Sequence, residues 1–260
     1  MPPYHLLLPM SRAALLLALV SLSATAQAGL VVGGSRFIYP DTKSSISVEL
    51  RNTATKDILV KVDMLPADPA PFSGTQEPLP DYAAAPFIAT PPLFVLNPGR
   101  SNKIRINRTG GELPVDRESL FRLAVSAIPA LDDDKSEGHR NQLQIAVRNK
   151  MKVFYRPKGL PGDPLKAYQA LHWTRRNDAL TLYNPTPYFV TLYNLKINGK
   201  VIDAGMMAPF SHRKQAWCPE DSICDIRWQT LDAYSNALPA WAVSLTTMQQ
   251  DAVGNAVVQK

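Results

Sequence analysis

The sequence contains few of the residues on which enzymatic and metal sites usually depend. Only two of its 260 residues are cysteine and only four are histidine. His139, His172 and His212 are isolated in sequence, and no Gly-x-Ser-x-Gly, His-Glu-x-x-His or phosphate-loop pattern occurs. A triad assembled from distant residues is the alternative, because triads are defined by geometry and not by residue order. We expect no enzymatic activity, no cofactor and no metal site.

Long hydrophobic runs are absent after the first residues. Residues 13–20 form an apolar run that is too short to span a bilayer, which needs roughly 20 apolar residues. The run follows Arg12 and precedes Ala26-Gln27-Ala28, which is the order of a secretory signal peptide. We expect cleavage after Ala28, so that a soluble, exported protein begins at Gly29. A buried N-terminal helix is the alternative.

Charge of one sign is not concentrated in any part of the chain. The formal net charge is +6, and removing Arg12 with the leader lowers it to +5 (6 − 1). This mild excess is spread along the sequence and forms no basic run. It favours an anionic protein or a membrane surface over nucleic acid as a partner. We expect neither a nucleic-acid partner nor a small-molecule substrate.

The two cysteines, Cys218 and Cys224, lie close together near the C-terminus. The residues between them include proline, glutamate, aspartate and serine, which are typical of a turn. In an oxidising compartment such a pair is expected to form a disulfide that closes a hairpin. A redox-active pair would more often be Cys-x-x-Cys, and a metal site would need nearby histidines, of which His212 is the only candidate.

The mature sequence has the pattern of β-strands throughout. No segment keeps an apolar period of 3.6 residues for three helical turns. Apolar residues instead alternate with polar ones, as Ile46, Val48 and Leu50 do among serine and glutamate. The other strand-like segments of the first half are residues 58–63, 103–106, 120–125 and 143–155. Turn-forming residues between them complete the pattern of an all-β sandwich or barrel.

The strand pattern is interrupted once and then starts again. Residues 155–162 combine proline, glycine and charge, a composition typical of a linker. Further strand-like segments follow at residues 179–183, 189–193 and 241–245. We therefore predict a signal peptide at 1–28, a first domain at 29–157 and a second domain at 158–260.

Two loops and the segment after the second loop have distinct compositions. Residues 66–80 are rich in proline and are expected to run over the surface. Residues 131–141 are polar and acidic, so we expect this loop to be mobile in the free protein. Directly after it, Leu143, Ile145 and Val147 alternate with other residues and would point to one face of a strand.

Such a strand, about residues 142–155, has two interpretations. At a sheet edge its unpaired N–H and C=O groups would be open to strand addition by another chain. An ordinary core strand is the alternative, and the pattern alone favours it.

Four segments of the mature chain resemble one protein family in their order and approximate spacing. They are Ala-Thr-Pro-Pro at 89–92 with Leu-Asn-Pro-Gly at 96–99, Asp-Arg-Glu-Ser-Leu-Phe at 116–121 with Ile-Pro at 128–129, Asn-Lys-Met-Lys-Val-Phe-Tyr-Arg-Pro at 149–157, and Asn-Pro-Thr-Pro-Tyr-Phe-Val-Thr at 184–191. The family that they resemble is the PapD-like family of periplasmic pilus chaperones. Four collinear segments are far more specific than any single motif.

The resemblance implies a fold, a location and partners. The fold is two immunoglobulin-like β-sandwich domains in a boomerang with a cleft between them. The implied protein is a chaperone of the chaperone–usher pathway, located in the periplasm. It folds, caps and delivers pilus (fimbrial) subunits by donor-strand complementation, and an outer-membrane usher is its second partner.

The resemblance also assigns roles to individual residues. Arg36 and Lys152 would anchor the C-terminal carboxylate of the subunit in the interdomain cleft. Leu143, Ile145 and Val147 would enter the groove left by the missing strand of the subunit. The anchor fixes the register, because a slip of one residue would turn these side chains to the other face. The loop at 131–141 would order on binding.

The sequence departs from the family pattern in places. The family links a glutamate, an arginine and an aspartate in an interdomain ion network, and the corresponding residues are Glu118, Arg156 and Asp232. The usual Asn-Asp-Tyr-Gly reads Leu-Asp-Ala-Tyr-Ser here, so Asp232 is displaced by one position. Residues 122–125 have fewer aromatic side chains than is usual. The loop before the donor strand is somewhat longer than in the short-loop subgroup, but no cysteines flank it as they often do in the long-loop subgroup. We expect the short-loop subgroup, with rod-like pili as cargo.

A different function on the same fold is a secreted adhesion or carbohydrate-binding module, because the sandwich hosts many functions. Such a module would present clustered aromatic residues on its end loops. Here the aromatic residues fall mostly in strand-like segments, which favours the chaperone.

Overall fold

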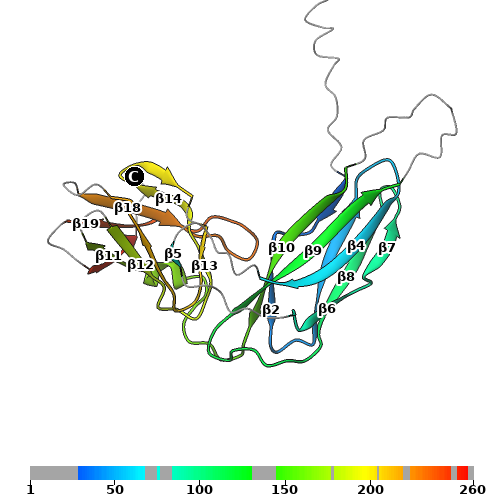
Figure 1. Cartoon of the computed structure of the whole chain (residues 1–260), viewed down its shortest axis with the longest axis horizontal. Coiled ribbons are helices and arrows are strands. Elements are labelled where there is room, and N and C mark those ends of the chain that lie inside the picture. The colour runs from blue at the N-terminus through cyan, green and yellow to red at the C-terminus, as the bar shows by residue number, and fades with distance from the viewer. Residues whose placement is uncertain are drawn as a thin grey trace, which may run out of the picture.

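The chain folds into two β-sandwiches that meet at an angle, in the shape of a boomerang (Figure 1). The computed structural model describes residues 29–67, 75–76, 84–130, 145–176, 179–203, 205–218, 223–246 and 251–256. The arrangement confirms the predicted all-β fold with two immunoglobulin-like domains. The expected signal peptide, the acidic loop at 131–141 and Leu143 lie outside the described residues. Within those ranges, no helix has the length and apolar composition needed to cross a membrane.

The first sandwich packs a four-stranded sheet against a five-stranded sheet. The four strands, in spatial order, are β1 (Leu30–Val32), β3 (Ser45–Asn52), β8 (Ser101–Arg108) and β6 (Phe87–Thr90). The five strands, in spatial order, are β2 (Arg36–Pro40), β10 (Val147–Arg156), β9 (Ser119–Pro129), β4 (Ile58–Pro66) and β7 (Leu93–Leu96). This order puts β10 near one edge of the larger sheet and β7 at the other.

The core of this sandwich follows from the alternation in the sequence. Val48 and Leu50 of β3 are fully buried, and Val48 lies opposite the equally buried Ile104 of β8. Between them on β3, Glu49 points to solvent. Full burial of each such aliphatic side chain contributes roughly 1.5–3 kcal/mol to folding.

The first residues of the central strand β9 are buried on both faces. Phe121 and Leu123 point into the core of the first sandwich. Leu120, on the other face, packs with Phe154 of β10 and Met206 of the second domain. Leu120 is therefore buried because the second domain covers this end of the outer face, whereas Arg122 and Ser126 on the same face stay partly exposed.

The second sandwich has two five-stranded sheets and a small two-stranded sheet. The first sheet contains β20 (Asp251–Val253), β11 (His172–Arg176), β12 (Ala179–Tyr183), β17 (His212–Gln215) and β5 (Thr75–Gln76). The second contains β15 (Lys200–Ile202), β14 (Tyr193–Ile197), β18 (Cys224–Gln229), β19 (Trp241–Leu245) and β21 (Asn255–Ala256). The small sheet pairs β13 (Val190–Thr191) with β16 (Met206–Met207), and a 3-10 helix, η1 (Ala167–Ala170), precedes β11. Trp173 and Trp228, whose ring centroids are 5.5 Å apart, form the centre of the core.

One strand of the second domain comes from the first half of the chain. Within the proline-rich loop expected at 66–80, β5 pairs with β17, and Gln76 lies opposite Arg213. This pairing covers the edge of β17, which would otherwise present open backbone groups. The sequence indicated a surface loop and carried no signal for this strand, because its partner lies far along the chain.

The chain changes sheets between β1 and β2. β1 pairs with β3 in the smaller sheet, whereas β2 pairs with β10 in the larger one. Gly33, at the crossover, packs so tightly that an added Cβ would lie 3.3 Å from the Glu49 carbonyl oxygen. After this crossover β2 begins at Arg36, and it runs beside only the second half of β10, from Lys152 to Arg156.

Candidate functional site

Two cations lie side by side at the inner edge of the first domain. β2 and β10 are parallel, and their register puts Arg36 directly opposite Lys152. The Lys152 N–H donates to the Ser35 carbonyl oxygen at 3.1 Å, which fixes this register. Opposed residues of neighbouring strands project to the same face of a sheet, and here that face borders the cleft between the domains. The structure thus brings together two residues that are far apart in sequence.

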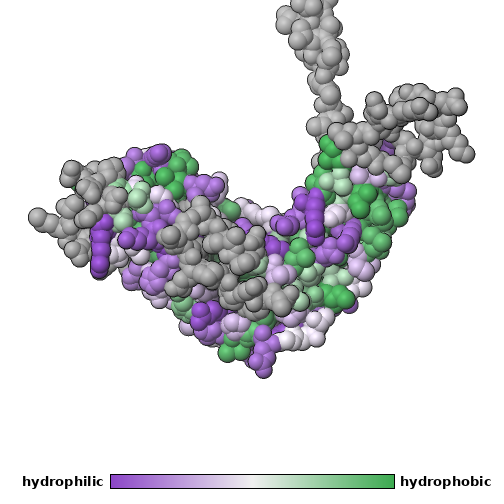
Figure 2. Space-filling model, in the orientation of Figure 1, coloured by the Kyte–Doolittle hydropathy of each residue, from purple (hydrophilic) through white to green (hydrophobic). Residues whose placement is uncertain are grey.

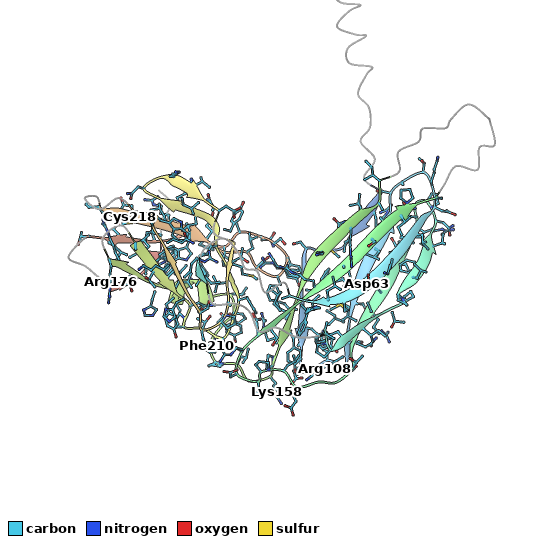
Figure 3. The ribbon with its side chains drawn as sticks, viewed as in Figure 1. Asp63, Arg108, Lys158, Arg176, Phe210 and Cys218 are labelled. Atoms are coloured by element: carbon cyan, nitrogen blue, oxygen red, sulfur yellow. A yellow bond between two sulfur atoms is a disulfide. The ribbon has the colours of Figure 1, made fainter. Side chains whose placement is uncertain are left out.

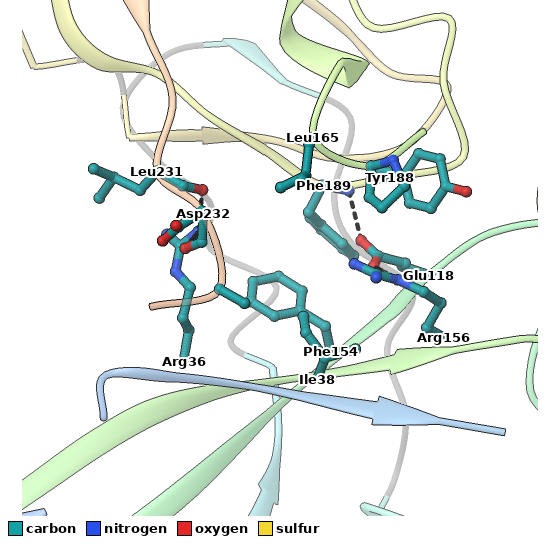
Figure 4. Close-up of a pocket in the computed structure, with 12 residues that line it drawn as sticks. Arg36, Ile38, Glu118, Phe154, Arg156, Leu165, Tyr188, Phe189, Leu231 and Asp232 are labelled. Atoms are coloured by element: carbon teal, nitrogen blue, oxygen red, sulfur yellow. Dashed lines mark hydrogen bonds and ion pairs between the residues drawn. The ribbon is translucent and has the colours of Figure 1, made fainter. Parts of the chain in front are cut away.

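Arg36 reaches across the cleft to the second domain (Figure 4). Its Nη1 donates to the carbonyl oxygens of Leu231 and Asp232, at 2.9 and 3.3 Å, and its Nη2 donates to the Thr191 hydroxyl at 2.9 Å. Burial lowers the pKa of Arg36, and the charges of Asp232 and Glu118 oppose this shift.

Lys152 is half-buried, and the charged groups that act on it among the described residues are cations. Burial lowers the pKa of its ammonium group, and the nearby Arg36 and Arg122 guanidinium groups lower it further. Within the described ranges, no hydrogen bond or ion pair involves this ammonium group. Two neighbouring cations without a carboxylate between them favour the binding of an anion.

Glu118 and Arg156 join the two domains. Arg156 Nε donates to Glu118 Oε1 at 2.7 Å, while Oε2 accepts the Phe189 N–H of the second domain at 2.8 Å (Figure 4). Glu118 N–H also donates to the Pro187 carbonyl oxygen at 2.9 Å. Burial raises the pKa of Glu118, and the Arg156 charge and the Phe189 N–H oppose this shift. Each domain therefore provides a hydrogen-bond donor to the Glu118 carboxylate.

Apolar contacts surround this ion pair. The rings of Phe154 and Phe189 lie 5.5 Å apart across the domain boundary. They belong to a small buried cluster with Leu120, Met206 and Ala208. The guanidinium group of Arg156 also lies 5.3 Å from the centre of the Tyr188 ring.

Asp232 has other partners than those expected from the resemblance. It lines the same pocket as Glu118 and Arg156. Its carboxylate, however, accepts the N–H groups of Tyr234 and Asn236, both at 2.8 Å. Among the described residues, the ion pair of Arg156 is with Glu118 alone, and the charge that lies near Asp232 is that of Arg36. Asp232 thus differs from the expected network residue both in its partners and in its position, which is displaced by one residue relative to the family pattern.

The first half of β10 has an open edge. β9 pairs with β10 from Val147 to Tyr155, but β2 pairs with it only from Lys152 onward. In the part of the chain that the structure describes, no strand lies beside Val147–Met151 on the β2 side. The strand begins at Val147, later than the expected residue 142, and Ile145 precedes it as irregular chain.

The apolar row of this segment is exposed. Ile145 and Val147 are 67% and 51% exposed. They line a pocket at the open end of the sandwich together with Leu30, Ile58 and Ala127. An added strand at the open edge would cover these apolar groups.

Cys218 and Cys224 form the predicted disulfide at the base of β18. The bond lies in the second domain, away from the first (Figure 3). It therefore has no part in the cleft.

Family models match both halves of the chain. One, described as "Pili and flagellar-assembly chaperone, PapD N-terminal domain", matches residues 29–161. Another, described as "Pili assembly chaperone PapD, C-terminal domain", matches residues 166–234. The chain belongs to the PapD-like family of pilus assembly chaperones. This is a family of chaperones and not of enzymes.

Relatives and solved structures of this family resemble the chain over most of its length. The uncharacterized fimbrial chaperone YcbF of Escherichia coli strain K12 is 39% identical over 210 residues, which cover 80% of this chain and 85% of that protein. The crystal structure of the periplasmic chaperone SfaE, 30% identical, covers 82% of this chain and 98% of its own, with a TM-score of 0.64. The SafB chaperone in complex with the SafA pilin, from Salmonella enterica, is 26% identical, with 85% and 99% covered and a TM-score of 0.69.

Some contacts of this family member were not accessible to sequence reasoning. Thr191 lies in a segment that carries the resemblance, yet its bond to Arg36 depends on how the domains meet. The bonds from Arg36 to the carbonyl oxygens of Leu231 and Asp232 involve the backbone, so the identity of these two residues does not indicate them. The apolar alternation around Phe154 indicated a strand and did not reveal that its outer face is buried.

Glu118→Ala is expected to loosen the connection between the domains. It removes the acceptor of the Phe189 N–H and the partner of Arg156, so the free energy of unfolding should fall by about 1–3 kcal/mol. Glu118→Gln keeps an acceptor for the N–H and should cost less. Urea denaturation gives the energies, and small-angle scattering gives the distribution of interdomain angles. Wild-type values for both quantities in Glu118→Ala would contradict this role.

Proposed function

We propose that the protein is a periplasmic chaperone that captures, folds and delivers pilus subunits by lending them the open edge of β10. The observation that carries the proposal is the half-paired strand β10, whose open edge ends beside two cations in register. An open strand edge binds another strand through main-chain hydrogen bonds, and its alternating side chains provide specificity. The residues beside that edge have the chemistry to fix where the bound strand ends.

The first half of β10 would act as the donor strand. The exposed Ile145 and Val147 would be buried by a subunit that lacks one strand of its own sandwich. Each side chain would contribute up to about 1.5–3 kcal/mol on full burial. The proposed row begins with Leu143, which precedes the described segment.

Arg36 and Lys152 would bind the C-terminal carboxylate of the subunit. A carboxylate between them would pair with both charges and relieve the repulsion that lowers the pKa of Lys152. Charge-assisted hydrogen bonds of this kind are roughly twice as strong as neutral ones. Because both residues lie at one end of the open edge, the carboxylate would also set the register of the subunit strand along β10.

The proposed location is the periplasm. A leader with the pattern of a signal peptide supports export. The disulfide between Cys218 and Cys224 is consistent with an oxidising compartment. The similarity to a chaperone described as periplasmic points the same way.

Arg36→Ala and Lys152→Ala should each abolish stable subunit capture while the chaperone stays folded. Loss of one partner of a buried charge pair costs about 2–5 kcal/mol of binding free energy. Lys150→Ala is the matched control, because Lys150 lies on the same strand and face but is exposed. Co-purification of a co-expressed pilin with each tagged variant is the measurement, with thermal unfolding as the test of folding.

Two results would count against the anchor. One is undiminished capture by Arg36→Ala and Lys152→Ala. The other is an equal loss in Lys150→Ala, which would indicate a general charge effect.

An apolar surface at the far edge of the same sheet suits the usher. Leu93 and Val95 of β7 are 56% and 57% exposed, and Val95 lies beside Leu59 of β4, which in turn lies beside the exposed Ile128 of β9. Hydrophobic residues gather on this side of the first domain (Figure 2). β9 and β4 separate β7 from β10. A partner on this surface would therefore leave the donor edge free for the subunit.

Leu93→Asp is expected to weaken binding of the chaperone–subunit complex to the purified usher. A charge in an apolar interface is costly unless it is paired, whereas the donor edge is untouched and subunit capture should be unchanged. Ile88→Asp on β6 is the control, since Ile88 is 51% exposed, close to the value for Leu93, but lies in the other sheet. Usher pull-down measures the effect. Equal usher binding by wild type and Leu93→Asp would exclude this surface.

A further inference from the structure

A loop of the second domain, residues 231–237, closes on itself beside Arg36. Asp232 holds it closed: Oδ1 accepts the N–H groups of Tyr234 and Asn236, and Oδ2 accepts from Asn236 Nδ2 at 3.1 Å. Leu231 and Ala237 form a β-bridge at its base. The backbone also closes the loop, because the Asp232 N–H donates to the Asn236 carbonyl oxygen at 2.9 Å and the Ser235 N–H donates to the Asp232 carbonyl oxygen at 3.1 Å. The Asp232 side chain adds three hydrogen bonds to this backbone closure.

The closed loop presents two carbonyl oxygens to the first domain. Those of Leu231 and Asp232 accept hydrogen bonds from Arg36 Nη1. The Ser235 hydroxyl, 2.8 Å from the Ser35 hydroxyl, forms a second link next to the first. The loop is therefore attached to β2 and to the residue before it, at the position of the proposed anchor.

These contacts use only part of the hydrogen-bonding capacity of Arg36. A guanidinium group has five N–H donors. Nη1 donates to two carbonyl oxygens and Nη2 donates to one hydroxyl, whereas within the described part of the chain the Nε–H and one of the two Nη2–H groups have no partner. Nε–H and an Nη2–H can lie on one edge of the guanidinium plane, where their spacing matches the two oxygens of a carboxylate.

We propose that Asp232 is a positioning residue for the carboxylate anchor. By helping to close the loop it directs two backbone carbonyl oxygens at Arg36, and this fixes the guanidinium group with its Nε–H free to donate to a carboxylate. The inference rests on the proposed function and concerns the same site. This role fits the displaced position of Asp232 in the sequence. At that position its carboxylate accepts hydrogen bonds from N–H groups of the loop, and Arg156 forms its ion pair with Glu118.

A purely electrostatic role of Asp232 predicts an effect of the opposite sign. Its negative charge lies near Arg36 and would repel an incoming carboxylate, so removing the charge should strengthen binding. Positioning instead requires the acceptor atoms and not the charge. Asp232→Asn keeps Oδ1, which accepts two of the three loop hydrogen bonds, whereas Asp232→Ala removes all three.

The probe is a synthetic peptide of alternating threonine and valine, with lysines at its N-terminus for solubility and a free C-terminal carboxylate. The same peptide with a C-terminal amide measures binding without the anchor. Calorimetry gives the ratio of the two affinities for wild type, Asp232→Ala, Asp232→Asn and Arg36→Ala. We expect Asp232→Ala to lower the preference for the carboxylate about three- to tenfold, the cost of re-ordering one long side chain. Asp232→Asn should keep the wild-type preference or exceed it.

The outcomes separate this inference from the proposed function. Equal affinities of wild type for the two peptides, or no effect of Arg36→Ala, would contradict the anchor itself. If Arg36→Ala loses the preference while Asp232→Ala keeps it, the anchor stands and the positioning role is wrong. An equal loss in Asp232→Ala and Asp232→Asn would also overturn positioning, since the acceptor atoms would then not matter.

Discussion

The parallel pairing of β2 with the second half of β10 is the interaction on which the rest of the structure depends. It sets Arg36 opposite Lys152, so two cations share one edge of the cleft. Because β2 reaches no further, no strand of the described residues lies beside Val147–Met151 on that side. The register of this one strand pair therefore produces both the open edge of β10 and the two cations at the end of that edge. A longer β2 would pair with the open backbone groups of β10 and remove the proposed binding edge.

The second domain completes this site. Glu118 and Arg156 form a buried link, and the Phe154 and Phe189 rings pack beside it. Buried ion pairs contribute little net stability, but they specify geometry when every partner is satisfied. We therefore infer that apolar burial supplies the attraction between the domains and that the ion pair helps to select one angle. That angle brings the second domain within hydrogen-bonding reach of Arg36.

Much of the fold was predictable from the sequence, because strands have a period of two residues. The alternation of Val48 and Leu50 with polar residues predicted which face of β3 is buried. The short spacing of Cys218 and Cys224 around turn-forming residues predicted the disulfide. The contacts that join the domains were not predictable in this way. Leu120 has no periodic signal for its partner in the second domain, and a carbonyl oxygen has no side chain to indicate its role. The proximity of Arg36 and Lys152 followed only from the family resemblance, since parallel pairing of distant segments has no local signature.

The central claim is that β10 lends an open edge, and amide hydrogen exchange tests it most directly. Along a strand, successive N–H groups point to opposite edges, so about half of the amides of residues 147–151 should exchange rapidly in the free chaperone. The same amides should become protected when a co-expressed pilin is bound, while those that face β9 stay protected throughout. Protection of every amide in the free protein, or no gain on binding the pilin, would contradict the account.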